Sequence, residues 1–286
     1  MIKKNINGFV MNLDTENSGI SDPLSRNPER EKVFMSILKD TIKEGMVCID
    51  LGANIGYTTL SMLKHIDSGY VYAIEPDPRN FTLLERNILK NKFGDKCELA
   101  SAAVSDVNGE MDFWLSDSSN VSSVHKTKNS SEKIKVNSYT LGKFLEDRRF
   151  PNFIKMDVEG HEVQILNGAL KYFNENEGDI RILMEVHPTF YNETDMNFAF
   201  ALKQYFDAGF KTKYVVSTPV PVPRLFREYG YTPINVQETD RASRGLYMDI
   251  PSDDVIRFAC YENEEMSPSK KKMSKKIVRS IMIERR

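Results

Sequence analysis

The sequence predicts an α/β protein built on a doubly wound, mostly parallel sheet with helices on both faces. Short apolar runs alternate four times with stretches whose apolar residues recur at helical spacing, which is the pattern of strands joined by crossover helices. Polar residues follow the carboxyl ends of these runs, where an open parallel sheet binds ligands. The 286 residues, of which 40% are hydrophobic, can bury one sizeable core, so we expect one main domain.

The first predicted unit is a helix, a strand, a glycine turn and a second helix. Residues 1–26 form a polar leader, and the first helix begins at Asn27-Pro28, where an N-cap residue precedes proline, and ends near Gly45. A buried strand over 46–51 then leads into the glycine turn of residues 52–56 and a second helical stretch.

Three further strand and helix pairs follow. Their strands are expected at residues 70–74, 153–158 and 180–186. A polar tract from Asp117 to Lys133, rich in Ser, Asn and Lys, interrupts them and is expected to be a mobile loop. Together with the first unit, these pairs place the main domain at residues 27–265.

The C-terminal third contains two segments of unusual composition. Residues 218–245 hold four prolines with several arginines and tyrosines, and we expect this long irregular stretch to shape a substrate pocket. A strand over 246–250 is expected to close the sheet after it. Residues 266–286 form a strongly basic tail, which we expect to be frayed or a short surface helix.

Composition narrows the classes of partner. The 39 basic and 41 acidic side chains give a net charge of -2, so there is no general attraction to nucleic acid or anionic lipid. The three cysteines are scattered and suggest neither disulfides nor structural zinc. The first residues are too polar for a signal peptide and no apolar run is long enough to span a membrane, so we expect a cytoplasmic protein.

The glycine turn and the acids near it predict a cofactor site. Asp50 precedes the turn, where a carboxylate would repel the pyrophosphate of a dinucleotide and would favour a cationic or zwitterionic ligand such as a sulfonium. Glu75 ends the next strand, where it can accept both ribose hydroxyls of an adenosine. The alternative is a plain turn flanked by ordinary acids. The predicted ligands of S-adenosylmethionine are Asp50, Gly52, Asn54, Gly56, Glu75 and Asp77.

Acids and a histidine end the two later strands, at Asp157, Glu185 and His187. An alcohol is a poor nucleophile at neutral pH, so transfer of a methyl group to it gains from a nearby base. We expect His187 to be a neutral base, unless it is a histidine satisfied by a neighbour. Asp157 and Glu185 would orient the hydroxyl or hold a cation such as Mg²⁺, of which the metal is the less favoured option.

Four segments carry a family resemblance. The stretches Ile49–Tyr57, Glu75-Pro76, Lys155–Glu162 and Glu185–Pro188 resemble the FkbM family of S-adenosylmethionine-dependent methyltransferases. The resemblance implies a seven-stranded methyltransferase sheet and O-methylation, often of a sugar or another small molecule. From the order of the segments along the chain, we expect the cofactor half at about residues 46–160 and the acceptor side at about 185–250.

Other functions remain open at this point. Amino-group methylation of nucleic-acid bases usually uses an Asn or Asp followed by Pro-Pro and an aromatic residue, whereas here Asp157 is followed by Val-Glu-Gly. A protein methyltransferase, a nicotinamide-dependent oxidoreductase and a non-catalytic adenosine-binding module are further alternatives. The sequence predicts no oligomeric state and does not identify the acceptor.

Overall fold

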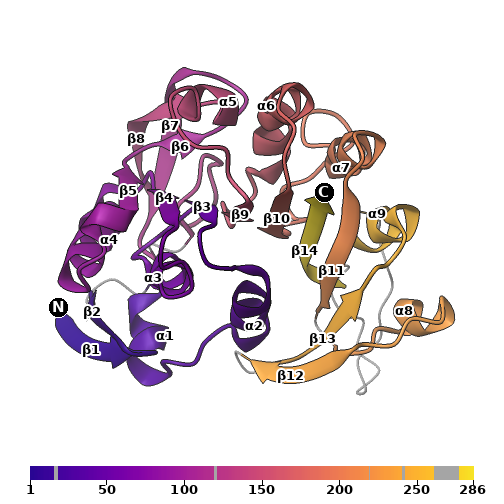
Figure 1. The fold of residues 1–286 in the computed structure, drawn as a ribbon, viewed down its shortest axis with the longest axis horizontal. Coiled ribbons are helices and arrows are strands. Elements are labelled where there is room, and N and C mark those ends of the chain that lie inside the picture. The colour runs from indigo at the N-terminus through magenta and orange to yellow at the C-terminus, as the bar shows by residue number, and fades with distance from the viewer. Residues whose placement is uncertain (16–18, 119–120, 219, 240–241, 261–276) are drawn as a thin grey trace.

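A nine-stranded sheet forms the centre of the molecule (Figure 1). The computed structural model describes residues 1–15, 19–118, 121–218, 220–239, 242–260 and 277–286. In order across the sheet the strands are β12 (Asn235–Thr239), β13 (Ala242–Met248), β11 (Lys211–Ser217), β14 (Val278–Arg285), β10 (Ile180–Glu185), β9 (Phe153–Met156), β3 (Val47–Leu51), β4 (Tyr70–Ile74) and β5 (Cys97–Ala100).

The predicted α/β fold class is confirmed. The five strands from β10 to β5 run parallel, and β3 is buried at every position, as a strand covered on both faces must be. On the other side of β10 the pairing becomes antiparallel, through β14, β11, β13 and β12. The sheet has nine strands where seven were expected, because β13 and β12 add an antiparallel edge.

Helices cover both faces of this sheet. One face packs against α1 (Ser21–Arg26), α2 (Lys32–Thr41), α3 (Tyr57–Leu63) and α4 (Pro78–Lys90). The other face packs against α5 (Leu141–Phe144), α6 (Glu162–Glu175), α7 (Phe198–Asp207), α8 (Arg224–Glu228) and α9 (Ser252–Cys260). A short 3-10 helix, η1 (Gly94–Lys96), precedes β5. In the part of the chain that the structure describes, no helix is long and apolar enough to cross a membrane.

The N-terminal residues belong to the core, so the expectation of a separate polar leader is wrong. Strands β1 (Ile2–Ile6) and β2 (Phe9–Leu13) form a hairpin around Asn7-Gly8, whose positive φ angles of 53° and 94° suit a two-residue turn. Residues Ile6, Met11, Leu13 and Leu24 are fully buried. The helix expected from residue 27 begins only at Lys32, after Glu31 in the left-handed region.

The C-terminal residues form a strand inside the main sheet, so the expectation of a frayed tail or a surface helix is wrong for them. Strand β14, the yellow arrow in Figure 1, lies between β10 and β11. Its residues from Ser280 to Ile283 are buried, and Met282 stands opposite Leu183. The apolar run from Ile281 to Ile283 therefore indicates a buried strand. The basic residues around it made the whole segment look like an exposed tail. The rest of the predicted tail, residues 266–276, lies outside the described residues.

Two segments expected to be irregular contain strands. A small three-stranded sheet is made of β6 (Ala103–Val104), β8 (Ser130–Tyr139) and β7 (Gly109–Ser116), and β8 takes up the last residues of the tract expected to be a loop. Residues 218–245 contain α8, β12 and the start of β13. Both segments were predicted from their composition. Composition carries no information about which strands pair with each other, and pairing is what makes these residues form strands.

Candidate functional site

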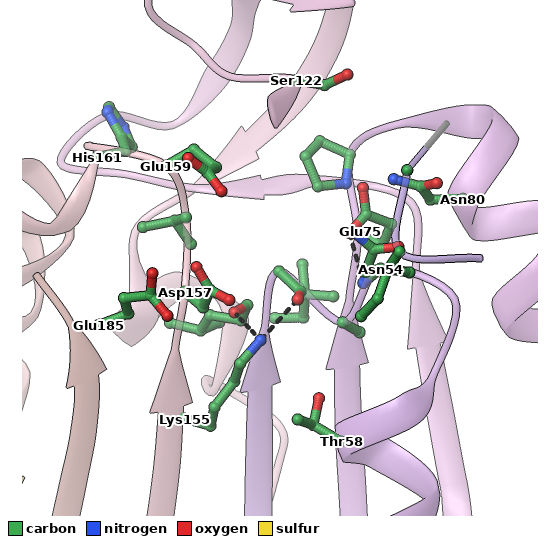
Figure 2. A pocket seen from close by; sticks show the side chains of 18 of the residues that line it. Asn54, Thr58, Glu75, Asn80, Ser122, Lys155, Asp157, Glu159, His161 and Glu185 are labelled. Carbon is green, nitrogen blue, oxygen red and sulfur yellow. Dashed lines mark hydrogen bonds between the residues drawn. The ribbon is translucent and has the colours of Figure 1, made fainter. Parts of the chain in front are cut away.

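A cavity of about 370 Å³ opens at the carboxyl ends of β3, β4, β9 and β10 (Figure 2). Residues between 19 and 31 form one wall, and Ser122 and Val124 contribute to another. The charged residues that line it are Arg30, Glu31, Glu75, Lys155, Asp157, Glu159, Glu185 and Arg279. No described residue between 218 and 245 lines this cavity, which corrects the expectation for that segment. Thr239 and Arg244 line only a smaller neighbouring pocket.

The glycine turn brings the backbone to the cavity. Gly52 has a φ of 73°, and a Cβ atom there would lie 2.0 Å from the carbonyl oxygen of Asp157, so only glycine fits. Asn54, with a φ of 52°, also lines the cavity, and its buried Oδ1 has no hydrogen-bond partner among the described residues. Gly56 does not line the cavity; at a φ of 91° it is the N-cap of α3.

Glu75 lies where the sequence predicts it. Its Oε2 accepts a hydrogen bond of 2.7 Å from the backbone N–H of Asn54, and its Oε1 accepts one of 2.9 Å from that of Asp77. Burial raises the pKa of the Glu75 carboxyl to about 7. The side chain lines the cavity beside Asn54 and Asn80 (Figure 2), so its remaining lone pairs are available to a ligand.

Asp50 is not a direct ligand residue, which corrects its predicted role. It is fully buried and does not line the cavity. Its Oδ2 accepts hydrogen bonds of 2.7 Å from the hydroxyls of Thr58 and Thr59, and its Oδ1 lies 3.0 Å from the Lys155 ammonium. Because Lys155 compensates its charge, Asp50 supplies no negative charge for a cationic ligand.

Asp77 likewise supports the site from outside the cavity. It is fully buried and is the N-cap of α4, where it accepts a hydrogen bond from the backbone N–H of Arg79. Its Oδ2 lies 2.6 Å from the Arg79 guanidinium and accepts a 3.0 Å hydrogen bond from the Ser122 hydroxyl. Asp77 therefore fixes Arg79 and Ser122 and does not line the cavity, contrary to its predicted role as a ligand residue.

The three predicted catalytic residues lie together. We call the carboxylates of Asp157, Glu159, Glu162 and Glu185 the carboxylate cluster, since all four surround His187. His187 Nδ1 donates to Glu162 Oε1 at 2.7 Å. Its Nε2 lies 3.3 Å from Glu185, 3.6 Å from Glu159 and 3.9 Å from Asp157. Glu185 also pairs with Arg279.

His187 is a cation in this setting, so the prediction of a neutral base is wrong. Burial alone would lower its pKa, but hydrogen bonds to Glu162 and Glu185 outweigh burial and raise the pKa to about 11. An imidazolium has no lone pair with which to accept a proton. The alternative considered for this residue, a histidine satisfied by its neighbours, describes its contacts better.

Glu159 was missed by the sequence interpretation. It lines the cavity (Figure 2) and has a φ of 49°, followed by Gly160 at 98°, and the Ser123 hydroxyl donates to its carbonyl at 2.9 Å. Burial, and then the charge of Asp157, raise the Glu159 pKa to about 8. The available signal was its place two residues after Asp157, in the turn that follows a strand.

The carboxylate cluster has the geometry to hold a metal ion, but its negative charge is already compensated by two cationic side chains. Asp157, Glu159 and His187 offer ligand atoms within 4.8 Å of one another. However, His187 already directs an N–H into the same group of carboxylates, and Arg279 adds a second positive charge beside Glu185. These two cations supply the compensation that a divalent ion would otherwise give, and we assign no metal to the site.

Known proteins are similar to this chain in sequence and structure. The family model described as "Methyltransferase FkbM domain" matches residues 50–232, which include nearly all of the four segments behind the sequence resemblance, and the resemblance is confirmed. The tRNA wybutosine-synthesizing protein 2 homolog of Bos taurus is 38% identical over 55 residues, or 19% of this chain and 13% of that protein. The homolog from Rattus norvegicus has the same identity, 38% over 55 residues, and the match again covers 19% of this chain and 13% of that protein. The chain thus spans a small part of these relatives.

Solved methyltransferase structures are also similar. The Methyltransferase FkbM from Methylobacillus flagellatus KT has 17% identity and a TM-score of 0.40, over 71% of this chain and 43% of that one. TYW2 from M. jannaschii, solved in complex with AdoMet, has 15% identity and a TM-score of 0.39, over 87% of this chain and 86% of that one.

Proposed function

The chain belongs to the FkbM family of methyltransferases, and on that premise we propose that it transfers the methyl group of S-adenosylmethionine to a hydroxyl oxygen of a sugar or another small-molecule acceptor. One observation supports this proposal most directly. A single cavity joins the buried Glu75 carboxylate at one end with the Asp157 and Glu159 carboxylates at the other (Figure 2).

The Glu75 end suits the nucleoside part of the methyl donor. Each Glu75 oxygen accepts one backbone hydrogen bond and keeps a lone pair, so the two can accept from two adjacent ribose hydroxyls. The buried Oδ1 of Asn54 is a further acceptor for a polar group of the donor. S-adenosylmethionine supplies the sulfonium methyl group, and Gly52, which lines the cavity, lets the turn pack against the Asp157 carbonyl.

The carboxylate cluster suits the hydroxyl of the methyl acceptor. As the hydroxyl oxygen bonds to the methyl carbon, the sulfur–methyl bond breaks and its electron pair goes to sulfur, so the hydroxyl proton must leave. Asp157 and Glu159 line the cavity, and Nε2 of His187 lies 3.9 and 3.6 Å from their carboxylates. Asp157 can take the proton, as can Glu159 in its ionised form, while the His187 cation holds the cluster together.

Small acceptors fit these charges better than nucleic acid does. The acceptor end presents Asp157, Glu159 and Glu185, which would repel a polyphosphate backbone, and the chain as a whole carries a net charge of -2. A neutral polyol such as a sugar meets no such repulsion and offers several hydroxyls to carboxylate acceptors.

Formation of S-adenosylhomocysteine from S-adenosylmethionine tests the proposal. The protein is incubated with the donor and separate sets of monosaccharides, nucleotide sugars, phenolic alcohols, peptides and transfer RNA. We expect acceptor-dependent product with a hydroxyl compound, and mass spectrometry should locate the methyl group on oxygen. Turnover confined to transfer RNA or peptide would reject the proposed acceptor class, and methyl found on nitrogen or carbon would reject O-methylation.

A further inference from the structure

We propose that Lys155 is a positioning residue that holds the glycine turn in its ligand-binding shape, by bonding the carbonyls of that turn while paired with Asp50. The proposal rests on the proposed function, since it concerns the site for S-adenosylmethionine. It assigns a role to a buried ion pair that neither binds a ligand directly nor belongs to the carboxylate cluster.

The ammonium group of Lys155 contacts the glycine turn and Asp50. From β9, Nζ lies 3.0 Å from Asp50 Oδ1 and donates to the carbonyl oxygens of Gly52 at 2.7 Å and Leu51 at 3.3 Å. Figure 2 shows the side chain reaching from β9 toward the neighbouring turn. Two of the three N–H donors of the ammonium group thus bond carbonyls of the turn, and the charge of Asp50 attracts the group from the side. Lys155 lines the cavity, and its ammonium group is held by the glycine turn and Asp50.

The turn is held from two sides, and Lys155 supplies one of them. On the β4 side, the backbone N–H groups of Gly52 and Ala53 both donate to the carbonyl of Ile74, at 3.0 Å. On the β9 side, Lys155 binds the Gly52 carbonyl. Gly52 lies in the left-handed region, at a φ of 73°. Without the ammonium group, its carbonyl would lose the hydrogen bond that holds it on the β9 side.

The same ion pair ties the two ends of the cavity together. Asp50 accepts from Thr58 and Thr59 at the start of α3, so the pair connects β9, the turn and that helix. Two residues beyond Lys155, the N–H of Asp157 donates to the carbonyl of Leu51 at 3.2 Å. The segment Lys155–Asp157 is thus hydrogen-bonded to the glycine turn at two successive carbonyls, those of Leu51 and Gly52.

Lys155 stays charged in this position. Burial would lower its pKa, but the charges of Asp50 and Asp157 outweigh burial and raise it. A buried ion pair is often no more stabilising than a well-packed apolar pair, so fold stability alone is a weak reason for the chain to bury one here. An apolar pair could not donate hydrogen bonds to the carbonyls of the turn, whereas Lys155 does.

Calorimetric binding of S-adenosylhomocysteine to two variants tests the role. Lys155→Met removes the ammonium at similar length but leaves Asp50 without its cation. The double variant Asp50→Asn/Lys155→Met removes both charges. We expect each to bind S-adenosylhomocysteine at least about tenfold more weakly than the wild type, because the bonds to the turn are lost in both. The double variant should recover most of the Tm lost by the single one without recovering affinity.

A matched control separates positioning from stability. Val255 in α9 is fully buried and does not line the cavity, so Val255→Ala should lower the Tm and leave the affinity unchanged. Wild-type affinity in the folded double variant would overturn the positioning role, as would an equal loss of affinity in Val255→Ala. A wild-type protein that does not bind S-adenosylhomocysteine would overturn the proposed function itself, and this inference with it.

Discussion

The two ends of the cavity differ in how their buried charges are compensated. At the glycine turn, Asp50 has Lys155 as a dedicated partner, and Glu75 accepts two backbone hydrogen bonds. At the other end, the four carboxylates of the cluster share His187, and Arg279 pairs with only one of them. Fixed, matched partners suit a binding site, whereas an excess of carboxylates suits a site that takes up a proton.

This difference has a direct electrostatic consequence. Carboxylates crowded together in a buried place disfavour the ionised form. Burial raises the pKa of Glu159 most, and the charges of Asp157, Glu185 and Glu162 add to the rise while that of His187 opposes it, so the pKa reaches about 8. A base poised near neutral pH is the most effective one for proton transfer at that pH.

The largest expected effect is on turnover at the carboxylate cluster. Glu159→Gln and Asp157→Asn should each lower kcat by about 10²–10⁴-fold, the usual contribution of a general base, if that residue receives the proton. Both variants should bind S-adenosylhomocysteine as the wild type does. Steady-state kinetics with the best acceptor measures the effect, with the exposed Glu193→Gln as a control. Wild-type turnover in both variants would show that the cluster is structural.

The next effect is on cofactor affinity at the glycine-turn end of the cavity. Glu75→Ala should weaken S-adenosylhomocysteine binding by about 1.5–3 kcal/mol, since it removes charged acceptors for buried hydroxyls. With a pKa of about 7, Glu75 is protonated below that pH and accepts less well, so wild-type affinity should fall as the pH drops through 7. Calorimetry across this range should find no such fall in Glu75→Gln. Unchanged affinity in folded Glu75→Ala would remove the residue from the site.

A smaller effect concerns stability against pH. Folding raises the pKa of Glu159 from 4.5 to about 8 and that of His187 from 6.5 to about 11. Both groups bind their protons more tightly when folded, so their contribution to stability is lost as the pH rises, and the two losses overlap between 6.5 and 8. The Tm should fall over that window, and less steeply in Glu159→Gln. A Tm that rises with pH there would contradict the charge assignment.

The smallest expected effect is that of a chelator. Because His187 and Arg279 already compensate the cluster, EDTA should leave turnover unchanged and added Mg²⁺ should not raise it. Loss of activity in EDTA, restored by one divalent ion, would instead make Asp157 and Glu159 metal ligands.

The sequence was sufficient for what depends on neighbouring residues. The buried strand β3, the turn at Gly52 and the carboxylate of Glu75 follow from local pattern, and the structure places them as predicted. The carboxyl-edge rule also brought Asp157, Glu185 and His187 together correctly.

What the sequence missed depends on partners that are distant along the chain. The charge of Asp50 looked available because Lys155, on another strand, was not recognised as its partner. The protonation of His187 depends on Glu162, at the start of a separate helix. Strand β14 was misjudged for a related reason, since its burial comes from pairing with β10 and β11.

Isothermal titration of the wild-type protein with S-adenosylhomocysteine is the decisive measurement for the cofactor site, because it requires no knowledge of the acceptor. We expect saturable binding at one site per chain, weakened by Glu75→Ala and unaffected by Glu159→Gln. Absence of binding by both S-adenosylhomocysteine and S-adenosylmethionine, with NAD binding to the same folded protein, would overturn the proposed function and favour an oxidoreductase.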